Sequence, residues 1–368
     1  MITQQMTTRQ AAMWFILFQL GSAFLLLPRV LAGTAKQDAW LSVLIAIGAF
    51  FLLVPLYTAI AKQLEETSFS DYILELFGRI GGKLLLCGFI VGYPYLLYII
   101  VLRDLSDFLT TSFITETPAE PILVLMMSAV IYIVRSGAAV IGRTVEILFF
   151  LVMLLFAFGY VSLIPSAEVT NLMPVLEHGW NPVLLAAFTM LIFPYSEMML
   201  FLFLVPNIRQ ARRWKKAVVK SALVSGSMFL LMTLLTISVL SDGVVSNIMY
   251  PSYFAVRTIS IGDFYERFEV LVAVLWYITI FYRLSLFLHV SVQGLAVVLG
   301  LQDPRPLLIP LSLIALVMAN IIWPNTAGYT AALQVWPFYS MFFGIFLPIL
   351  IWMVGIFKRA KNSISKEN

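Results

Sequence analysis

Apolar runs of about 20 residues follow one another along the chain, and a run of this length forms a helix that crosses the hydrocarbon core of a bilayer. Hydropathy predicts ten such spans, whose ends are defined to within several residues. They cover residues 10–31, 39–61, 83–102, 120–135, 143–164, 183–206, 217–240, 268–289, 307–323 and 335–357. The chain is 61% hydrophobic and 11% charged, whereas a soluble domain has about 25% charged residues. We therefore expect an all-α integral membrane protein in which residues 1–368 form a single transmembrane domain.

The basic residues are divided unequally between the two sets of connections. With the N-terminus in the cytoplasm, the inner connections hold 17 Lys and Arg and the outer ones hold five, while Arg283 lies within a span. This bias follows the positive-inside rule and predicts that both termini, including the tail 358–368, are cytoplasmic. Residues 209–220 hold six of the inner cations, either as a topology anchor or as a lipid or partner site. Because the net charge of +4 reflects topology, we expect no nucleic-acid partner.

The patterns of soluble enzymes and metal proteins are missing from the sequence. Cys87 is the single cysteine, and His178 and His289 lie outside any Cys/His cluster, so we expect no metal and no cofactor. The stretch GRIGGK, residues 78–83, lacks the spacing and the Ser or Thr of a nucleotide-binding loop. No Ser/His/Asp set or carboxylate pair stands out, and we expect a protein that is not an enzyme.

The span 183–206 contains a helix breaker and a carboxylate, in the stretch MLIFPYSEMML. Pro194 frees backbone carbonyls of the preceding turn, which hydrocarbon tolerates only when they are buried in protein or face a watery cavity. Glu197 costs about 2.5 to 3.5 kcal/mol at the centre of a membrane helix, so it needs a partner inside the bundle. A proline kink alone is a common packing device. The combination with Tyr195, Ser196 and Glu197 favours a cavity.

The span 10–31 has a weak point of its own, at Gln19, Gly21, Ser22 and Ala23. Small residues permit close helix packing; alternatively, Gly21 to Ala23 form an unwound hinge that faces the other break. Pro28 and Pro206 end two similar stretches 178 residues apart, and the same offset aligns Gln19 with Glu197.

This offset divides the ten spans into two repeats of five, about 9–164 and 183–357, of which the second is inverted. Paired interruptions in corresponding spans of two inverted halves indicate a binding site near the bilayer midplane.

A zwitterionic amino acid suits such a site. The positive end of a half-helix attracts the ligand carboxylate, while freed carbonyls or Glu197 accept from its ammonium group. Phe24 and Phe193 are expected to bound the side-chain pocket. Polar residues of two other spans are further candidates. The predicted ligand-binding set is Gln19, Gly21, Ser22, Ala23, Tyr98, Tyr195, Ser196, Glu197, Arg283 and Ser285.

Two members of this set have competing interpretations. Tyr98 either gates the cavity or belongs to an interfacial aromatic belt. Arg283 either pairs with Glu197 or another carboxylate, or extends towards the cytoplasmic face.

Four stretches together resemble the B subunits of GerA-type spore germinant receptors. They are QLGSAFLLLP, FPYSEMML, YPSYFAVRTISIGDFYERFE and WYITIFYR. The resemblance, which covers the whole chain, implies the amino acid/polyamine/organocation transporter superfamily: a LeuT-like five-plus-five inverted repeat of ten helices with helices 1 and 6 broken. It also implies residence in the spore inner membrane, assembly with A and C receptor subunits, and a ligand pocket between helices 1, 3, 6 and 8. Related transporters have a Gly-x-Gly-like hinge where this chain has Gly-Ser-Ala.

Three functions are compatible with these features. The first is a nutrient sensor that binds a small amino acid and triggers germination together with its partner subunits. The second is a proton-coupled amino acid transporter with Glu197 as the proton carrier. The third is a structural membrane scaffold.

Overall fold

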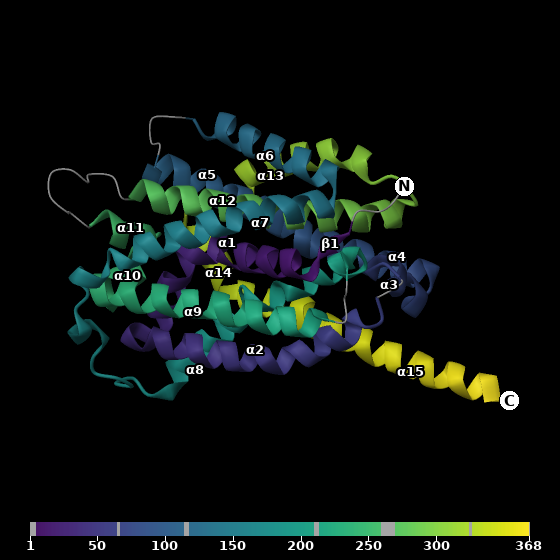
Figure 1. Ribbon diagram of the computed structural model, residues 1–368, viewed down its shortest axis with the longest axis horizontal. Helices are drawn as coiled ribbons and strands as arrows, with labels where there is room; N and C mark the ends of the chain where they lie inside the picture. Colours follow the sequence, from purple (N-terminus) through teal and green to yellow (C-terminus); the bar gives the residue numbers. More distant parts are fainter. Residues whose placement is uncertain are drawn as a thin grey trace.

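A computed structural model of the chain describes residues 5–64, 67–113, 118–209, 213–258, 269–323 and 326–367. Within these ranges the chain is almost entirely helical, and the long helices lie side by side along one axis (Figure 1). The prediction of an all-α membrane protein is confirmed.

Each predicted span corresponds to a helical segment. In chain order these are α1 (Thr8–Ala35), α2 (Ala39–Ala61), α4 and α5 (Arg79–Ile90 and Leu96–Phe108), α6 (Ala119–Ser136), α7 (Ala138–Val161), α8 with the 3₁₀ helix η6 (Trp180–Ile192 and Tyr195–Asn207), α9 (Trp214–Leu240), α12 (Glu269–Leu299), α13 (Leu308–Ile321), and α14 and α15 (Thr326–Met341 and Leu347–Glu367). Seven described segments are long and apolar enough to cross a membrane, and the first of them, Thr8–Ala61, contains both α1 and α2. The two remaining spans are α6 and the shorter α13.

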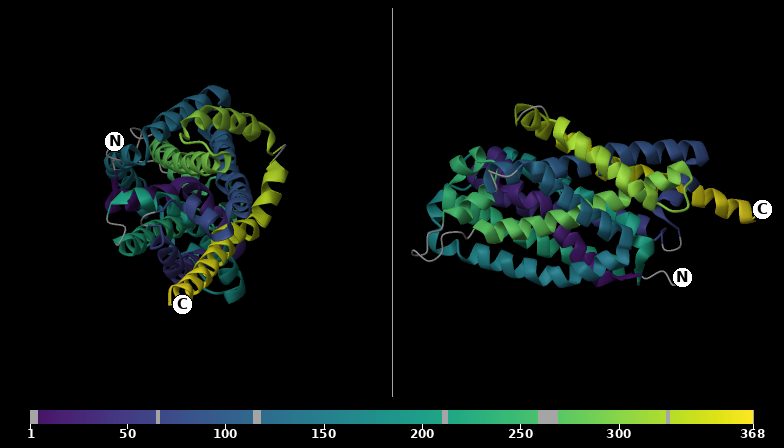
Figure 2. Two further views of the ribbon diagram at one scale, coloured as in Figure 1. Left: turned by 90° about the vertical axis from the view of Figure 1, so that its right-hand side faces the viewer. Right: turned by 90° about the horizontal axis from the view of Figure 1, so that it is seen from above.

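Helix α1 is the core of the bundle. Every side chain from Met13 to Pro28 is buried, and the helix packs against α12, α9, α8 and α7. Figure 1 shows α1 in purple between α12 and α7 on one side and α9 and α2 on the other, and the end-on view in Figure 2 agrees. A helix that is buried on all sides is held by its neighbours rather than by lipid.

This packing also explains why α1 continues beyond Pro28. Pro28 was predicted to end the first span near residue 31, but α1 continues to Ala35. Proline removes one intrahelical hydrogen bond, and the surrounding helices hold the chain in helical form across that gap.

Shorter elements fill the ends of the bundle. They are α3 (Phe69–Phe77), α10 (Asp242–Asn247) and α11 (Pro251–Arg257). Helix α11 lies within the aromatic stretch YPSYFAVRTISIGDFYERFE before α12, and residues 259–268 of that stretch lie outside the described residues.

Two short strands connect the start of α1 to the end of η6. Strand β1 (Met6–Thr7) pairs in parallel with β2 (Ile208–Arg209), with Met6 opposite Ile208 and Thr7 opposite Arg209. The Thr8 hydroxyl adds a 2.9 Å hydrogen bond to the Arg209 carbonyl. Strand β1 and the end of α15 lie at the same end of the bundle (Figure 1), as an even number of spans requires. That this end is cytoplasmic stays a prediction.

Substitution of two adjacent glycines of α4 by alanine tests the packing of the bundle, because the two changes are expected to affect the free energy of unfolding differently. A Cβ on Gly82 would lie 2.8 Å from the Leu74 Cα and 3.0 Å from the Ile73 carbonyl oxygen, whereas a Cβ on Gly81 would meet nothing within 4 Å. We expect Gly82→Ala to lower the free energy of unfolding by about 1–3 kcal/mol through overpacking. Gly81→Ala should leave it unchanged or raise it by up to about 1 kcal/mol through helix propensity. Thermal unfolding of the purified variants in detergent measures both; equal effects would contradict the α3–α4 contact.

Candidate functional site

Helix α1 is interrupted at one residue, Gly21. Its backbone angles, φ −28° and ψ −114°, are not helical, whereas the residues on both sides are. The expected hinge over Gly21 to Ala23 is therefore confined to Gly21. In an unbroken helix the carbonyl of Phe18 would accept from the N–H of Ser22. Here it accepts a 3.1 Å hydrogen bond from Nη1 of Arg283 on α12.

The second interruption separates α8 from η6. Helix α8 ends at Ile192, Phe193 is extended with φ −125° and ψ 114°, and Pro194 precedes the first residue of η6. Proline cannot continue the hydrogen-bond ladder of α8, so the chain restarts as a second half-helix that carries Glu197. The prediction that helices 1 and 6 are broken is confirmed.

A buried ion pair joins the two breaks. Nη2 of Arg283 lies 2.8 Å from Oε1 and 2.7 Å from Oε2 of Glu197. The Arg283 side chain is 0% exposed and that of Glu197 is 1% exposed. Arg283 was predicted either to pair with Glu197 or another carboxylate, or to extend towards the cytoplasmic face, and in the structure it pairs with Glu197.

The surroundings of the Arg283–Glu197 ion pair explain both where the pair lies and why position 21 is a glycine. The guanidinium carbon lies 4.7, 5.3 and 5.1 Å from the ring centroids of Phe18, Phe193 and Phe287, at distances typical of cation–π contacts. A Cβ on Gly21 would lie 2.5 Å from the Arg283 Cδ. Only glycine lets the arginine stem lie this close to α1.

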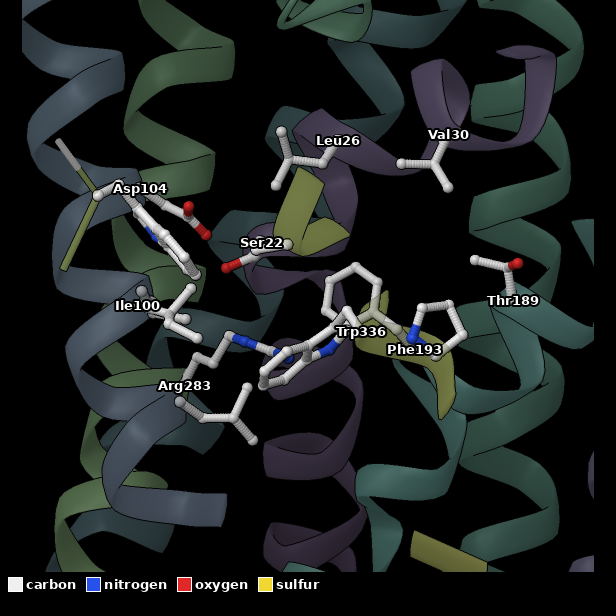
Figure 3. Close-up of a pocket in the computed structure, with 14 residues that line it drawn as sticks. Ser22, Leu26, Val30, Ile100, Asp104, Thr189, Phe193, Arg283 and Trp336 are labelled. Atoms are coloured by element: carbon white, nitrogen blue, oxygen red, sulfur yellow. The ribbon is translucent and has the colours of Figure 1, made fainter. Parts of the chain in front are cut away.

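A cavity of about 70 Å³ lies next to the ion pair, on the side of the Ser22 half of α1 (Figure 3). Its walls come from α1, α5, α8, α12 and α14, together with the end of α13. The lining residues are Ser22, Leu26, Val30, Leu97, Ile100, Val101, Asp104, Thr189, Phe193, Arg283, Trp323, Ala332, Trp336 and Pro337. Most of these side chains are apolar, and Ser22, Asp104 and Arg283 supply polar groups of different character.

Two buried hydrogen-bond donors at the cavity lack partners among the described residues. They are the Ser22 hydroxyl and Nε of Arg283. A buried donor without a partner costs about 1–3 kcal/mol, which a ligand with acceptor oxygens would recover. Asp104, a carboxylate that is 6% exposed, faces the same space from α5 (Figure 3).

The cavity continues into a larger groove of about 480 Å³. The two share Leu26, Val30, Thr189 and Pro337. Arg29 lines this groove and donates to Sδ of Met249 at 2.7 Å. The groove thus adjoins the cavity on the side away from β1.

Four of the predicted ligand-binding residues come together around the breaks. Ser22 and Arg283 line the cavity, while Gly21 and Glu197 contact Arg283 directly. Phe193, expected to bound the pocket, also lines it.

Other predicted residues on α1 and η6 face neighbouring helices. Oε1 of Gln19 accepts a 2.5 Å hydrogen bond from Ser225 of α9. Tyr195 donates to the Ala222 carbonyl at 3.3 Å. Ala23 is 0% exposed in the core.

Three more predicted side chains have local or remote partners. Ser196 of η6 donates across the break to the Ile192 carbonyl of α8 at 2.8 Å, and Ser285 donates to the Phe281 carbonyl at 2.7 Å within α12. The Tyr98 hydroxyl lies 3.5 Å from Ser312 of α13. None of these three lines the cavity, and their role in ligand binding stays a prediction.

Asp104 and Trp336 are cavity residues that the sequence did not single out. The predicted third span ended at residue 102, two residues before Asp104, whereas α5 continues to Phe108. The sequence signal that could have identified Asp104 was its position, a carboxylate so close to the end of an apolar run that the same helix can continue to it. Among the described residues, no three His, Cys, Asp or Glu side chains gather as a metal site.

Comparisons with known proteins agree on family and fold. A family profile described as "Spore germination protein" matches residues 5–327. Spore germination protein KB of Bacillus subtilis is 30% identical over 98% of this chain and 97% of its own length. Spore germination protein XB of Bacillus anthracis is 26% identical over 90% of this chain and 89% of its own.

Two solved structures share the arrangement of helices. MhsT in complex with L-phenylalanine superposes with a TM-score of 0.57 at 16% identity, over 96% of this chain and 99% of MhsT. Mhp1, a nucleobase-cation-symport transporter, gives 0.62 at 14% identity, over 91% of this chain and 78% of Mhp1. Both are LeuT-fold transporters, so the chain has the LeuT fold that was expected.

The ion pair predicts a pattern of stability that depends on which partner is removed. Arg283→Met should lower the free energy of unfolding by about 3–5 kcal/mol, because it leaves Glu197 buried without a counter-charge. Adding Glu197→Leu to Arg283→Met should recover most of that loss, since a buried pair replaced by apolar residues is often neutral. The matched control is Arg305→Met, which removes an exposed 4.0 Å pair with Asp303 and should cost less than about 1 kcal/mol. Detergent unfolding curves in which Arg283→Met and Arg305→Met behave alike would rule out a buried pair.

Proposed function

Since the chain belongs to the spore germination protein family, we propose that it is the B subunit of a germinant receptor and that it binds a small amino acid in the cavity beside Arg283. Its role is binding rather than catalysis. On this proposal the multi-pass subunit resides in the spore inner membrane with both termini in the cytoplasm. It acts together with A and C receptor subunits, to which it passes the signal that the nutrient has arrived.

The observation that carries the proposal is the polarity of the cavity. The unpartnered donors Ser22 Oγ and Arg283 Nε suit a carboxylate, and Asp104 supplies an acceptor with negative charge for an ammonium group. Hydrogen bonds to charged groups contribute about 1.5–3 kcal/mol each. A zwitterion brings a charge of matching sign to both kinds of group at once, whereas a simple amine brings one matching charge and a neutral sugar brings none.

The dimensions of the cavity favour a small ligand. One water needs about 10–15 Å³ of such space, so a cavity of about 70 Å³ holds about five water-sized groups. Glycine and alanine have about this number of non-hydrogen atoms. A bulkier side chain would have to displace Phe193 or Trp336, or extend into the groove at Leu26 and Val30.

We assign different roles to the two carboxylates. The sequence left two candidate acceptors for the ligand ammonium, freed backbone carbonyls and Glu197, and in the structure both Glu197 oxygens lie beside the Arg283 guanidinium. We therefore assign Glu197 to holding η6 against α12 and α1, and Asp104 to the ligand.

Ligand binding then becomes a change in the balance between two arrangements of the broken helices. A ligand shifts such an equilibrium only by its differential affinity for the two states. The polar groups come from α1, α5 and α12, so a ligand that contacts all three favours the state in which they are close. The break at Phe193 lies on the wall of the same cavity.

The proton-coupled transporter is the second candidate, and the LeuT fold favours it. In this structure, protonation of Glu197 would leave Arg283 as a buried charge without its partner, which is strongly unfavourable. A carrier role for Glu197 would therefore require the ion pair to open during each cycle.

The ammonium role of Asp104 predicts a shifted dose response. Asp104→Asn should raise the amino acid concentration for half-maximal germination by about 10- to 100-fold, because it removes a charged hydrogen bond worth about 1.5–3 kcal/mol. The control is Asp107→Asn, the same change one turn further along α5, where the side chain pairs with Arg103 at 2.8 Å. Spores that carry each variant as their only B subunit, matched for protein level, give the comparison.

Equal responses of the two variants would remove Asp104 from the ligand site. Counterflow of a labelled amino acid in proteoliposomes that contain this chain alone would instead favour the transporter. A chain that acts only as a scaffold would show neither a ligand-dependent response nor counterflow.

A further inference from the structure

A second, strongly basic hollow of about 1000 Å³ lies at the end of the bundle that carries β1. It is formed by the start of α1, strand β2 and the start of α9. The lining residues are Thr7, Thr8, Arg9, Ala12, Arg209, Arg213, Lys216, Ala217 and Lys220. Five of these nine side chains are cationic and none is acidic, so the hollow concentrates positive charge around a space large enough for an anionic group.

Among the described residues, the ion pair that Arg9 forms at the hollow is weak. Nε of Arg9 lies 3.8 Å from Oε1 of Glu146, and the two side chains are 63% and 37% exposed. Exposed pairs of this kind contribute little, and Glu146 already accepts a 3.0 Å hydrogen bond from Gln10. Within the described part of the chain, the other four cations of the hollow, Arg209, Arg213, Lys216 and Lys220, form no ion pair.

The cations of α9 also lie where the helix itself disfavours them. Helix α9 begins at Trp214, no side chain caps its first turn, and no acidic residue lies there. Lys216 thus occupies the positive end of the helix dipole, which favours anions over cations, and Lys220 lies one turn further along α9. The positive-inside rule explains basic residues on this side of the membrane, but it does not require them to converge on one hollow.

The exposed face of α9 places the hollow at the surface of the bilayer. Lys216 and Lys220 are followed at helical spacing by Leu223, Val224 and Leu231, which are exposed as well. Residues three and four apart share one helix face. Since the large apolar side chains on that face contact lipid tails, the lysines lie about one to two turns away, at the level of the phospholipid phosphates.

We propose that the basic hollow binds the phosphate headgroup of an anionic phospholipid, whose acyl chains lie along the exposed apolar face of α9. Arg213, Lys216 and Lys220 supply the charge from the α9 side, and Arg9 and Arg209 supply it from the opposite wall. Basic clusters at the edge of a membrane helix recognise anionic headgroups in this manner. The apolar face continuous with the cations distinguishes a lipid from a free anion or an acidic protein segment.

The position of the hollow gives the lipid a mechanical consequence. Arg9 belongs to the first turn of α1 and Arg209 follows the end of η6, and these two segments are already joined by the pairing of β1 with β2. A phosphate held by both would hold together the ends of the two broken helices on this side of the membrane.

The test uses the full-length chain in detergent and a phosphatidylglycerol with a fluorescent acyl chain. We expect saturable binding that unlabelled phosphatidylglycerol displaces and phosphatidylcholine does not. The variant Arg213→Gln/Lys216→Gln/Lys220→Gln should bind at least about tenfold more weakly, since each basic residue near an anionic lipid contributes about fivefold. The control Lys62→Gln/Arg79→Gln/Arg359→Gln removes the same charge from exposed positions outside the hollow and should bind within about twofold of the parent.

Each other outcome overturns the proposal. Equal weakening of the two triple variants would show that net charge alone attracts the lipid, and unchanged binding of the first would show that the hollow is not the site. Equally effective competition by millimolar inorganic phosphate would indicate a free-anion site, and by an acidic peptide a site for an acidic protein segment. All six substituted side chains are exposed or line an open hollow, and matching thermal unfolding curves would establish that both variants are folded.

Discussion

The buried ion pair between Arg283 and Glu197 connects three elements that would otherwise be independent. Arg283 belongs to α12, Glu197 to the half-helix η6, and the Phe18 carbonyl, which accepts from the same guanidinium, to α1. Removing two charges from water costs several kcal/mol per ion unless their geometry and hydrogen bonds compensate. The aromatic rings of Phe18, Phe193 and Phe287 keep water away from the pair. The breaks in helices 1 and 6 are thus the positions at which backbone and carboxylate groups become available to a fixed internal cation.

The cavity follows from this arrangement. Gly21 must lack a side chain because Arg283 lies against it, and the extended backbone at Phe193 opens the space on the other side of the arginine. Two donors, Ser22 Oγ and Arg283 Nε, remain unpartnered in the described chain, and Asp104 adds the opposite charge from α5. On the function proposed above, the charges of this site select a zwitterion and its volume selects a small one. Two of the three helices that carry these groups, α1 and α12, are joined by the Arg283 guanidinium.

Much of this architecture was predictable, because hydropathy and charge act over whole helices. The ten spans, the break at Pro194 and a partner for Glu197 all follow from the cost of polar groups in hydrocarbon. Asp104 was missed because an apolar run marks where a span is hydrophobic, and α5 extends beyond it. The directions of Tyr195 and Ser196 were not predictable, since a proline break resets the helical phase that relates neighbouring side chains. The pairing of β1 with β2 involves two residues on each strand, too few for a periodic signal, and it depends on the ends of two distant helices meeting.

The central claim is that the carboxylate and the ammonium group of a zwitterion are recognised separately, by groups on different helices. Germination of spores whose sole receptor contains this chain, measured across a panel of matched compounds, tests it most directly. The panel pairs glycine and alanine with the amines that lack their carboxylate and the acids that lack their ammonium group. The account predicts a response to the intact amino acids and none to either partial compound at the same concentration. An equal response to the amine or to the acid, or a response confined to uncharged nutrients, would contradict it.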